Sequence, residues 1–299
     1  MRLKAKMTKD NMLQLHVLLA SFERISAKAA LHLTPKTFKI SLITESVDTP
    51  QCFAEMGTDD LFQEYKIQSQ SDNAILFEIG LDLLSWALAS GKAAEHGVLK
   101  LVKRGTKPFL CFEAYAQSAA TMKVLHDIPI RILQATNIVY YMPPLVAPPT
   151  VSLKLPRGKM MRTVIEKLNK FSKNVVVTAS QTGRLVFRVE HASVTIKTFF
   201  TNLTPFYPSN LHRDTDAKNS ATIKLDVKKL SAILNLHLLS WDDACIFIVN
   251  NATVLIELAM PAFGGGVGGA DGGSISFYIP VLLLNREDEL EYGQEAEMV

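Results

Sequence analysis

The chain has 299 residues, of which 48% are hydrophobic and 20% are charged. This composition is typical of folded globular proteins and excludes the disordered and collagen-like classes. At about 150 residues per domain, the length predicts two domains. No apolar run reaches the roughly 18 residues that a membrane-spanning helix needs, so no membrane association is expected.

The cysteines and the charge distribution indicate the cellular environment and the kind of partner. Cys52, Cys111 and Cys245 are odd in number, scattered and without a Cys-x-x-Cys pair, which predicts reduced, buried thiols in an intracellular protein and no structural zinc. The net charge is +3, but residues 286–299 hold six acids and one arginine, so residues 1–285 carry +8. A basic body with an acidic tail is consistent with a polyanionic partner.

The first half of the chain switches between strand and helix patterns. Leu3, Ala5 and Met7 alternate with basic residues, as in a half-buried strand, and leucines spaced three and four apart follow, as on one face of a helix. Asp82 precedes a second apolar helical run and is expected to cap it. The expected elements are a strand over 2–7, a helix over 11–29, a hairpin turning at 34–36, a helix from 82 to 91, a hairpin turning at 104–106, and a strand over 124–133 whose proline places it at an edge or a strand end.

The second half repeats this order. Its expected elements are a strand over 151–156, a helix over 157–173 with Met161, Val164, Ile165, Leu168 and Phe171 on its apolar face, a hairpin turning at 182–183, a strand over 191–200, a helix after Asp226, a hairpin turning at 250–251 and a strand from 274. The two helix-capping aspartates differ in position by 144, the hairpin turns at 36 and 183 by 147, and the strand prolines at 129 and 280 by 151. Offsets of this size are typical of a duplicated domain.

The repeat predicts an α+β fold in which each domain packs two helices on one face of a mostly antiparallel sheet. The Pro-rich segment YYMPPLVAPPT marks the boundary, because its prolines favour an extended, semi-rigid connector. We assign a first domain to 1–140, the connector to 141–150, a second domain to 151–285 with a Gly-rich loop at 262–273, and an acidic tail to 286–299. The loop and the tail are expected to be disordered.

No catalytic constellation is recognisable. Gly-x-Ser-x-Gly, His-Glu-x-x-His and Walker-type motifs are absent, and the seven histidines are not at ligand spacing. Residues 264–269 fit Gly-x-Gly-x-x-Gly but lead into a strand, so they predict a hairpin loop and not a phosphate site. We therefore expect no catalysis, no metal and no cofactor. The alternative is an enzyme that uses His126, Asp127 or the glycine loop, which substitution of His126 would test.

Positive charge gathers on the expected helices. One such face is ordinarily a solvated helix surface, but four helices with the same tendency favour a surface that meets phosphates without reading sequence. No zinc-finger spacing, RNP-type motif or basic zipper is present. The helix over 157–173 carries Lys159, Arg162, Lys170 and Lys173 with one acid, Glu166; Arg24 and Lys28 end the first helix, Lys92 ends the second, and Lys228 and Lys229 start the fourth.

Several segments, taken in order, carry a family resemblance. They are ERISAKAALHLTPKTFKI from position 23, HDIPIRI from 126, VSLKLPRGKMMRTVIEKLNKFSKNVVV from 151, and CIFIVNN with VLIELAM from 245. The duplicated α+β halves resemble the DNA sliding clamps related to PCNA, and these segments resemble in detail the Hus-one subunits of the heterotrimeric checkpoint clamp. The resemblance spans Met1 to about Val281.

The resemblance implies a nuclear, non-catalytic subunit that joins two other clamp-like subunits in a ring on double-stranded DNA. It also implies a clamp loader and contacts with checkpoint and repair proteins. The residues implied to face DNA are Arg24, Lys28, Lys92, Arg157, Lys159, Arg162, Lys170, Lys173, Lys228 and Lys229. Subunit contacts are implied at edge strands, expected at 108–115 and 184–190, with Phe109, Leu110, Cys111, Phe112, Leu185, Val186, Phe187 and Arg188 at the interface.

Three segments depart from the family pattern, and one alternative function stays open. The Gly-rich loop and the acidic tail are unlike the compact end of the family. The connector YYMPPLVAPPT, which holds Pro143, Pro144, Leu145 and Val146, also matches the family poorly, so the resemblance does not carry a partner-peptide site over to Pro143, Leu145 or Val146. The alternative function is a replicative, PCNA-like homotrimeric clamp. That protein would form a stable trimer by itself, whereas a checkpoint subunit needs two unlike partners.

Overall fold

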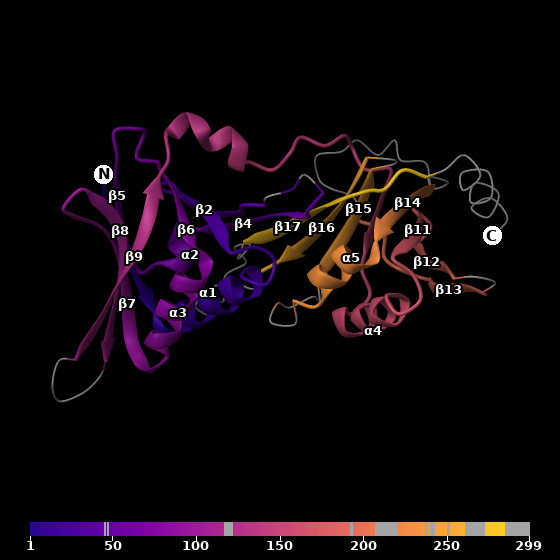
Figure 1. Cartoon of the computed structure of the whole chain (residues 1–299), viewed down its shortest axis with the longest axis horizontal. Helices are drawn as coiled ribbons and strands as arrows, with labels where there is room; N and C mark the ends of the chain where they lie inside the picture. Colours follow the sequence, from indigo (N-terminus) through magenta and orange to yellow (C-terminus); the bar gives the residue numbers. More distant parts are fainter. Residues whose placement is uncertain are drawn as a thin grey trace. The chain divides into compact units, whose positions relative to one another are not determined.

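The computed structural model describes residues 1–44, 46, 48–116, 122–191, 194–206, 220–236, 239, 243–249, 252–260 and 273–284. The described chain forms two compact units (Figure 1). The first contains Met1–Thr44, Cys52–Pro143 and Ala259–Ile275, and the second contains chiefly Pro144–Leu258. The acidic tail and all of the Gly-rich loop except Gly273 lie outside the described residues.

The first unit is built on antiparallel strands in the order β4-β3-β2-β6-β9-β8-β7-β1-β5. Strands β7 and β8 form the hairpin expected at Gly105, and β2 and β3 form the hairpin expected at Pro35. The strands are β1 (Arg2–Thr8), β2 (Lys28–Leu33), β3 (Thr37–Leu42), β4 (Gln51–Gly57), β5 (Glu64–Gln68), β6 (Ile75–Gly80), β7 (Ala94–Arg104), β8 (Lys107–Ala116) and β9 (Lys123–Ile132).

Two helices cover one face of these strands: α1 (Lys9–Phe22) and α3 (Leu81–Ser90), which lie side by side in Figure 1. Leu3, Ala5 and Met7 of β1 are buried, while Arg2 and Lys4, which alternate with them, are exposed. The approach of α1 to the sheet is close at Gly97, because a Cβ there would lie 2.3 Å from Met12 Sδ. The core of the unit therefore lies between the helices and this face.

Strand β9 changes partners along its length. Lys123–Pro129 pairs with β8, whereas Ile130–Ile132 pairs with β6. Pro129 is the last residue of β9 that pairs with β8, so it stands at this change of partners. The expectation that the proline marks a strand end or edge is met in this form, because the first part of β9 has one neighbouring strand only among the described residues.

The second unit repeats the pattern with two groups of antiparallel strands. One group has the order β10-β15-β16-β17, and the other has the order β13-β12-β11-β14. Helices α4 (Gly158–Leu168) and α5 (Val227–Leu234) pack against each other. The strands are β10 (Val151–Lys154), β11 (Asn174–Ser180), β12 (Arg184–His191), β13 (Val194–Phe200), β14 (Ser220–Asp226), β15 (Ala244–Val249), β16 (Thr253–Ala259) and β17 (Ser274–Pro280). The turn expected at 250–251 lies outside the described residues.

Two helices are shorter than their sequence patterns indicate. Helix α1 ends at Phe22, not at Ala29, because the Ser26 hydroxyl donates to the Ile43 carbonyl at 2.6 Å and turns the chain into β2. Helix α4 ends at Leu168, and Phe171, expected on its apolar face, is 44% exposed. In both cases the apolar spacing continues past the point where tertiary hydrogen bonds or lost packing end the helix.

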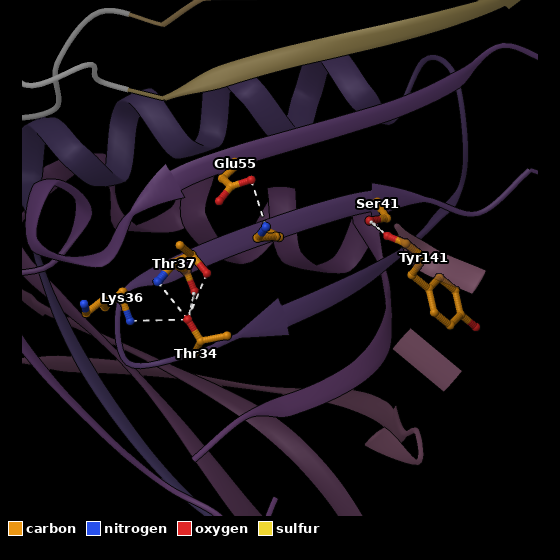
Figure 2. A network of polar contacts seen from close by, with 7 residues as sticks. Thr34, Lys36, Thr37, Ser41, Glu55 and Tyr141 are labelled. Atoms are coloured by element: carbon orange, nitrogen blue, oxygen red, sulfur yellow. Dashed lines mark hydrogen bonds and ion pairs between the residues drawn. The ribbon is translucent and has the colours of Figure 1, made fainter. Parts of the chain in front are cut away.

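Short helices escaped the sequence patterns altogether. They are α2 (Thr58–Leu61) and the 3-10 helices η1 (Gly91–Ala93) and η2 (Ala135–Tyr141). Figure 2 shows how η2 is held, since the Ser41 hydroxyl of β3 donates to the Tyr141 carbonyl at 2.6 Å. The same view shows the β2–β3 turn, in which Thr34 Oγ1 accepts from the Thr37 amide at 2.9 Å.

Candidate nucleic-acid interface

Helix α4 presents cationic side chains opposite its apolar face. Met161, Ile165 and Leu168 are buried, while Lys159 is exposed. Arg162 is half-buried, and its Nε donates to the carbonyl of Leu234, the last residue of α5, at 3.1 Å. A cation at a helix C-terminus is favourable because the carbonyl end carries partial negative charge. Arg162 therefore has a structural role that its position in the basic stripe did not reveal.

Helix α5 begins at the cap that its sequence predicts. Asp226 accepts from the amides of Lys228 and Lys229 at 2.7 and 3.2 Å, which confirms it as the N-cap. Two lysines in the first turn are unfavourable for the helix, since this end carries partial positive charge. Helix stability therefore does not explain why they stand there.

The paired expectation for Asp82 is wrong. The N-cap of α3 is Gly80, and no side chain caps this helix end. The helix begins earlier because the Leu81 amide donates to the Ala27 carbonyl at 2.9 Å, which places Asp82 inside the first turn. There its charge still complements the helix dipole.

The cations expected in the first unit lie on different elements from those predicted. Arg24 is exposed in the turn after α1, and Lys28 opens β2, not a helix. Lys92 is exposed on η1, directly after α3. Burial, and next the charge of Lys92, lower the pKa of His16 on α1. Helix α1 contacts both η1 and α3, so Lys92 lies beside the surface that α1 and α3 share.

The remaining predicted cations flank α4. Arg157 is the N-cap residue and is exposed. Lys170 and Lys173 are exposed too, but they follow the helix in a turn, because α4 ends at Leu168. All ten candidates are thus exposed or half-buried, and they are spread over helices, helix ends and one strand.

The prediction that segments 108–115 and 184–190 are edge strands is wrong. Strand β8 pairs with both β7 and β9, and β12 pairs with both β11 and β13. Each is the second strand of a hairpin that a third strand then covers, so neither offers unpaired main-chain groups along its length. Of the interface candidates, Leu110, Cys111, Phe112, Leu185, Phe187 and Arg188 are buried, and Phe109 and Val186 are half-buried.

Unpaired edges lie one strand further along. In the described residues, Lys123–Ile128 of β9 has a strand on one side only, and β13 ends its sheet. Trp86 of α3, 67% exposed, packs edge-on against His126 of β9 with ring centroids 5.2 Å apart. Ser90 Oγ lies 2.7 Å from His126 Nε2. Strands pair with segments far away in the sequence, so the alternation of apolar and polar residues within one strand could not identify these edges.

Each unpaired edge has exposed apolar side chains nearby. We call β9 123–128, with Trp86, Met122 and Leu125, the first edge surface; Met122 is 56% exposed and Leu125 is 44% exposed. We call β13 with its exposed Val194 and Phe199 the second edge surface. Exposed apolar groups beside unpaired strands are the features that strand addition uses in protein association.

The alternative catalytic residues do not form a joint site. His126 contacts Ser90 and Trp86, while Asp127 pairs with Arg104 on β7. Neighbouring strand residues point to opposite faces, which separates the two side chains. Within the described ranges no group of three acids, histidines or cysteines is placed to hold a metal. Cys52, Cys111 and Cys245 are buried and free, as predicted.

The connector residues Pro143, Pro144, Leu145 and Val146 are all exposed and follow the anchored Tyr141. The resemblance did not carry a partner-peptide site over to these residues, and none is assigned to them. Among the described helices, none has the length and apolar character needed to cross a membrane.

The architecture matches a known class. A PCNA from Thermococcus kodakaraensis superposes with a TM-score of 0.66, covering 94% of this chain and all of that one at 16% identity, so the fold is the α+β fold of the sliding clamps. The family model for Hus1-like protein matches residues 1–282, and the chain belongs to this family.

Curated relatives agree. A "Checkpoint protein hus1 homolog" of Dictyostelium discoideum is 27% identical over 289 residues, covering 95% of this chain and all of the relative. "Checkpoint protein HUS1" of Homo sapiens is 29% identical over 214 residues, covering 69% of this chain and 75% of the relative.

Proposed function

We propose that this protein is a non-catalytic subunit of a heterotrimeric ring clamp that is loaded on damaged DNA and acts in nuclear checkpoint signalling and repair. The observation that carries the proposal is the match to the Hus1-like family over residues 1–282 on a clamp fold. Its clamp-like domains are residues 1–140 and 151–285, joined by the connector 141–150. A clamp loader and repair proteins are its further partners.

DNA contact in this proposal is sequence-independent. Cations on or beside α4 and α5, after α1 and α3, and at the start of β2 meet phosphates, and no base-reading element is required. The placement of Lys228 and Lys229 at the positive end of α5 supports this role, because it disfavours the helix and favours an anion. The full set is Arg24, Lys28, Lys92, Arg157, Lys159, Arg162, Lys170, Lys173, Lys228 and Lys229.

Partner subunits contact the two edge surfaces. These surfaces differ in sequence and belong to different units, so each contacts a different partner subunit, the head-to-tail arrangement that closes into rings. Trp86 is the expected anchor of the first edge surface, since large exposed aromatic side chains dominate binding energy in interfaces. Partner binding would extend the sheets at β9 and β13.

Retention on DNA tests the proposal. The assembled ring, loaded on nicked circular DNA, should stay bound at high salt and should be lost when the circle is cut. This result is expected because topological linkage does not depend on phosphate contacts. Equal loss from circular and linear DNA as salt rises would contradict encirclement.

A further inference from the structure

One part of the first unit concentrates positive charge away from the helices. Strands β5, β1, β7, β8 and β9 carry ten basic and four acidic residues, a net charge of +6, whereas β2, β3, β4 and β6 carry two of each. The ten are Arg2, Lys4, Lys6, Lys66, Lys100, Lys103, Arg104, Lys107, Lys123 and Arg131; the four are Glu64, Glu95, Glu113 and Asp127.

The register aligns three of these lysines in a row. Lys4 of β1 lies directly opposite Lys66 of β5 on one side and Lys100 of β7 on the other. Cross-strand neighbours are about 5 Å apart at Cβ, and like charges there are destabilising. The row faces away from the helices, because the alternate residues Leu3 and Ala5 are buried in the core. We call Arg2, Lys4, Lys66 and Lys100 the basic sheet face.

Acidic neighbours neutralise only part of this face. Lys4 lies 3.4 Å from Glu64, and Lys100 lies 2.7 Å from Glu113. No ion pair of Arg2 or Lys66 is found among the described residues. All four residues line one open cavity of about 920 Å³, so an anion can approach them together.

The chemistry of the face selects the partner. Strands β1, β5, β7 and β8 have no exposed large hydrophobic residue in the described chain, so they lack the apolar anchors of a protein interface. The nearby ring of Tyr65 is half-buried and stacked on Phe62, with centroids 5.1 Å apart, so one of its faces is already covered. Repulsion between aligned ammonium groups is relieved by closely spaced negative charges, which a phosphate backbone supplies.

We propose that the basic sheet face is a second DNA-binding surface, which holds the phosphate backbone of a duplex outside the helices that face the ring's interior. It acts through salt-sensitive contacts and does not require ring assembly. Encirclement under the proposed function is a separate mode of binding, resistant to salt.

The test measures binding of a short fluorescent DNA duplex to the isolated chain over a range of salt concentrations. The variant Arg2→Gln, Lys4→Gln, Lys66→Gln should weaken binding on the order of tenfold at low salt and reduce the salt slope by about 2.7 for three lost contacts. Lys100 is left in place because it neutralises buried Glu113. The matched control is Lys36→Gln, Lys39→Gln, Lys154→Gln, which removes equal charge elsewhere and should change binding little.

Equal weakening by the two triple variants would overturn the proposal, as would stronger competition by polyglutamate than by DNA of equal charge, which would identify an acidic protein partner. If the triple variant fails to fold, Lys66→Gln alone should reduce the slope by about 0.9. High-salt retention of the assembled ring on circular DNA should be the same for the triple variant and the wild type, which separates this surface from encirclement.

Discussion

Glu113 is a buried glutamate whose ionised carboxylate is stabilised by neighbouring side chains. It is 5% exposed on β8, and Lys100, Tyr115 and Lys123 contact its carboxylate at 2.7, 2.6 and 2.9 Å. Burial by itself raises the pKa of Glu113, but the three hydrogen bonds outweigh it and lower the pKa to about 2. The sequence could not reveal this cluster, because its members come from three strands.

The depressed pKa predicts an acid-dependent loss of stability. The contribution of Glu113 is present above its unfolded-state pKa and is lost as pH falls through that value toward about 2. Glu113→Gln should lower the free energy of unfolding by about 2 kcal/mol at neutral pH and flatten its decline between about pH 5 and pH 2. Urea unfolding from neutral pH down to about pH 2 measures both effects, and an unchanged pH dependence would refute the assignment.

Helix ends were only partly predictable from sequence. Asp226 and Asp82 precede similar apolar runs, yet only Asp226 makes the cap, because a tertiary hydrogen bond from Leu81 starts α3 earlier. The same limit applies to α1, which Ser26 ends seven residues before the apolar pattern does. Strands, hairpins and the duplicated order followed from local alternation, whereas the true edges depend on pairing between distant segments.

The two aspartates form a matched pair for experiment. Asp226→Ala should lower the free energy of unfolding by about 1 kcal/mol, because two amides lose their acceptor. Asp82→Ala should cost less, since it removes only a favourable charge in the first turn. Chemical denaturation of both variants decides the matter, and equal losses would show that the cap at Asp226 contributes nothing of its own.

Substitution of Trp86 tests whether the first edge surface binds a partner subunit. Trp86→Ala should leave the unfolding midpoint nearly unchanged, because the ring is 67% exposed, but should weaken binding of the partner at this edge by about 2 kcal/mol or more. Leu83→Ala, which removes another exposed side chain of α3, is the control. Affinity measured by titration of the partner subunit would tell them apart, and wild-type affinity in the Trp86 variant would exclude it as an anchor.

At the scale of the whole molecule, the fold class was predictable from the duplicated order of elements, and the family was predictable from the resemblance of several segments taken in order. The residues that face DNA were harder to predict from the sequence. Arg162 donates a hydrogen bond to the carbonyl at the end of α5, and Lys28 lies on a strand. Lys159→Gln with Lys170→Gln and Lys228→Gln is therefore the cleaner probe. It should preserve folding and weaken the salt-dependent binding of the assembled ring to a linear DNA duplex, because three phosphate contacts are lost and the slope of log K against log salt concentration falls by about 2.7. An unchanged slope would remove these residues from the DNA-facing set.

The most direct test of the central claim is the mass of the purified chain in solution, measured by light scattering alone and after coexpression with the two other checkpoint-clamp subunits. The proposed function predicts that the 33.1 kDa chain does not form a homotrimer and enters a one-to-one-to-one assembly with both partners. A stable homotrimer of the chain alone would contradict it and favour a replicative clamp, and a chain that ignores both partners would contradict the clamp assignment itself.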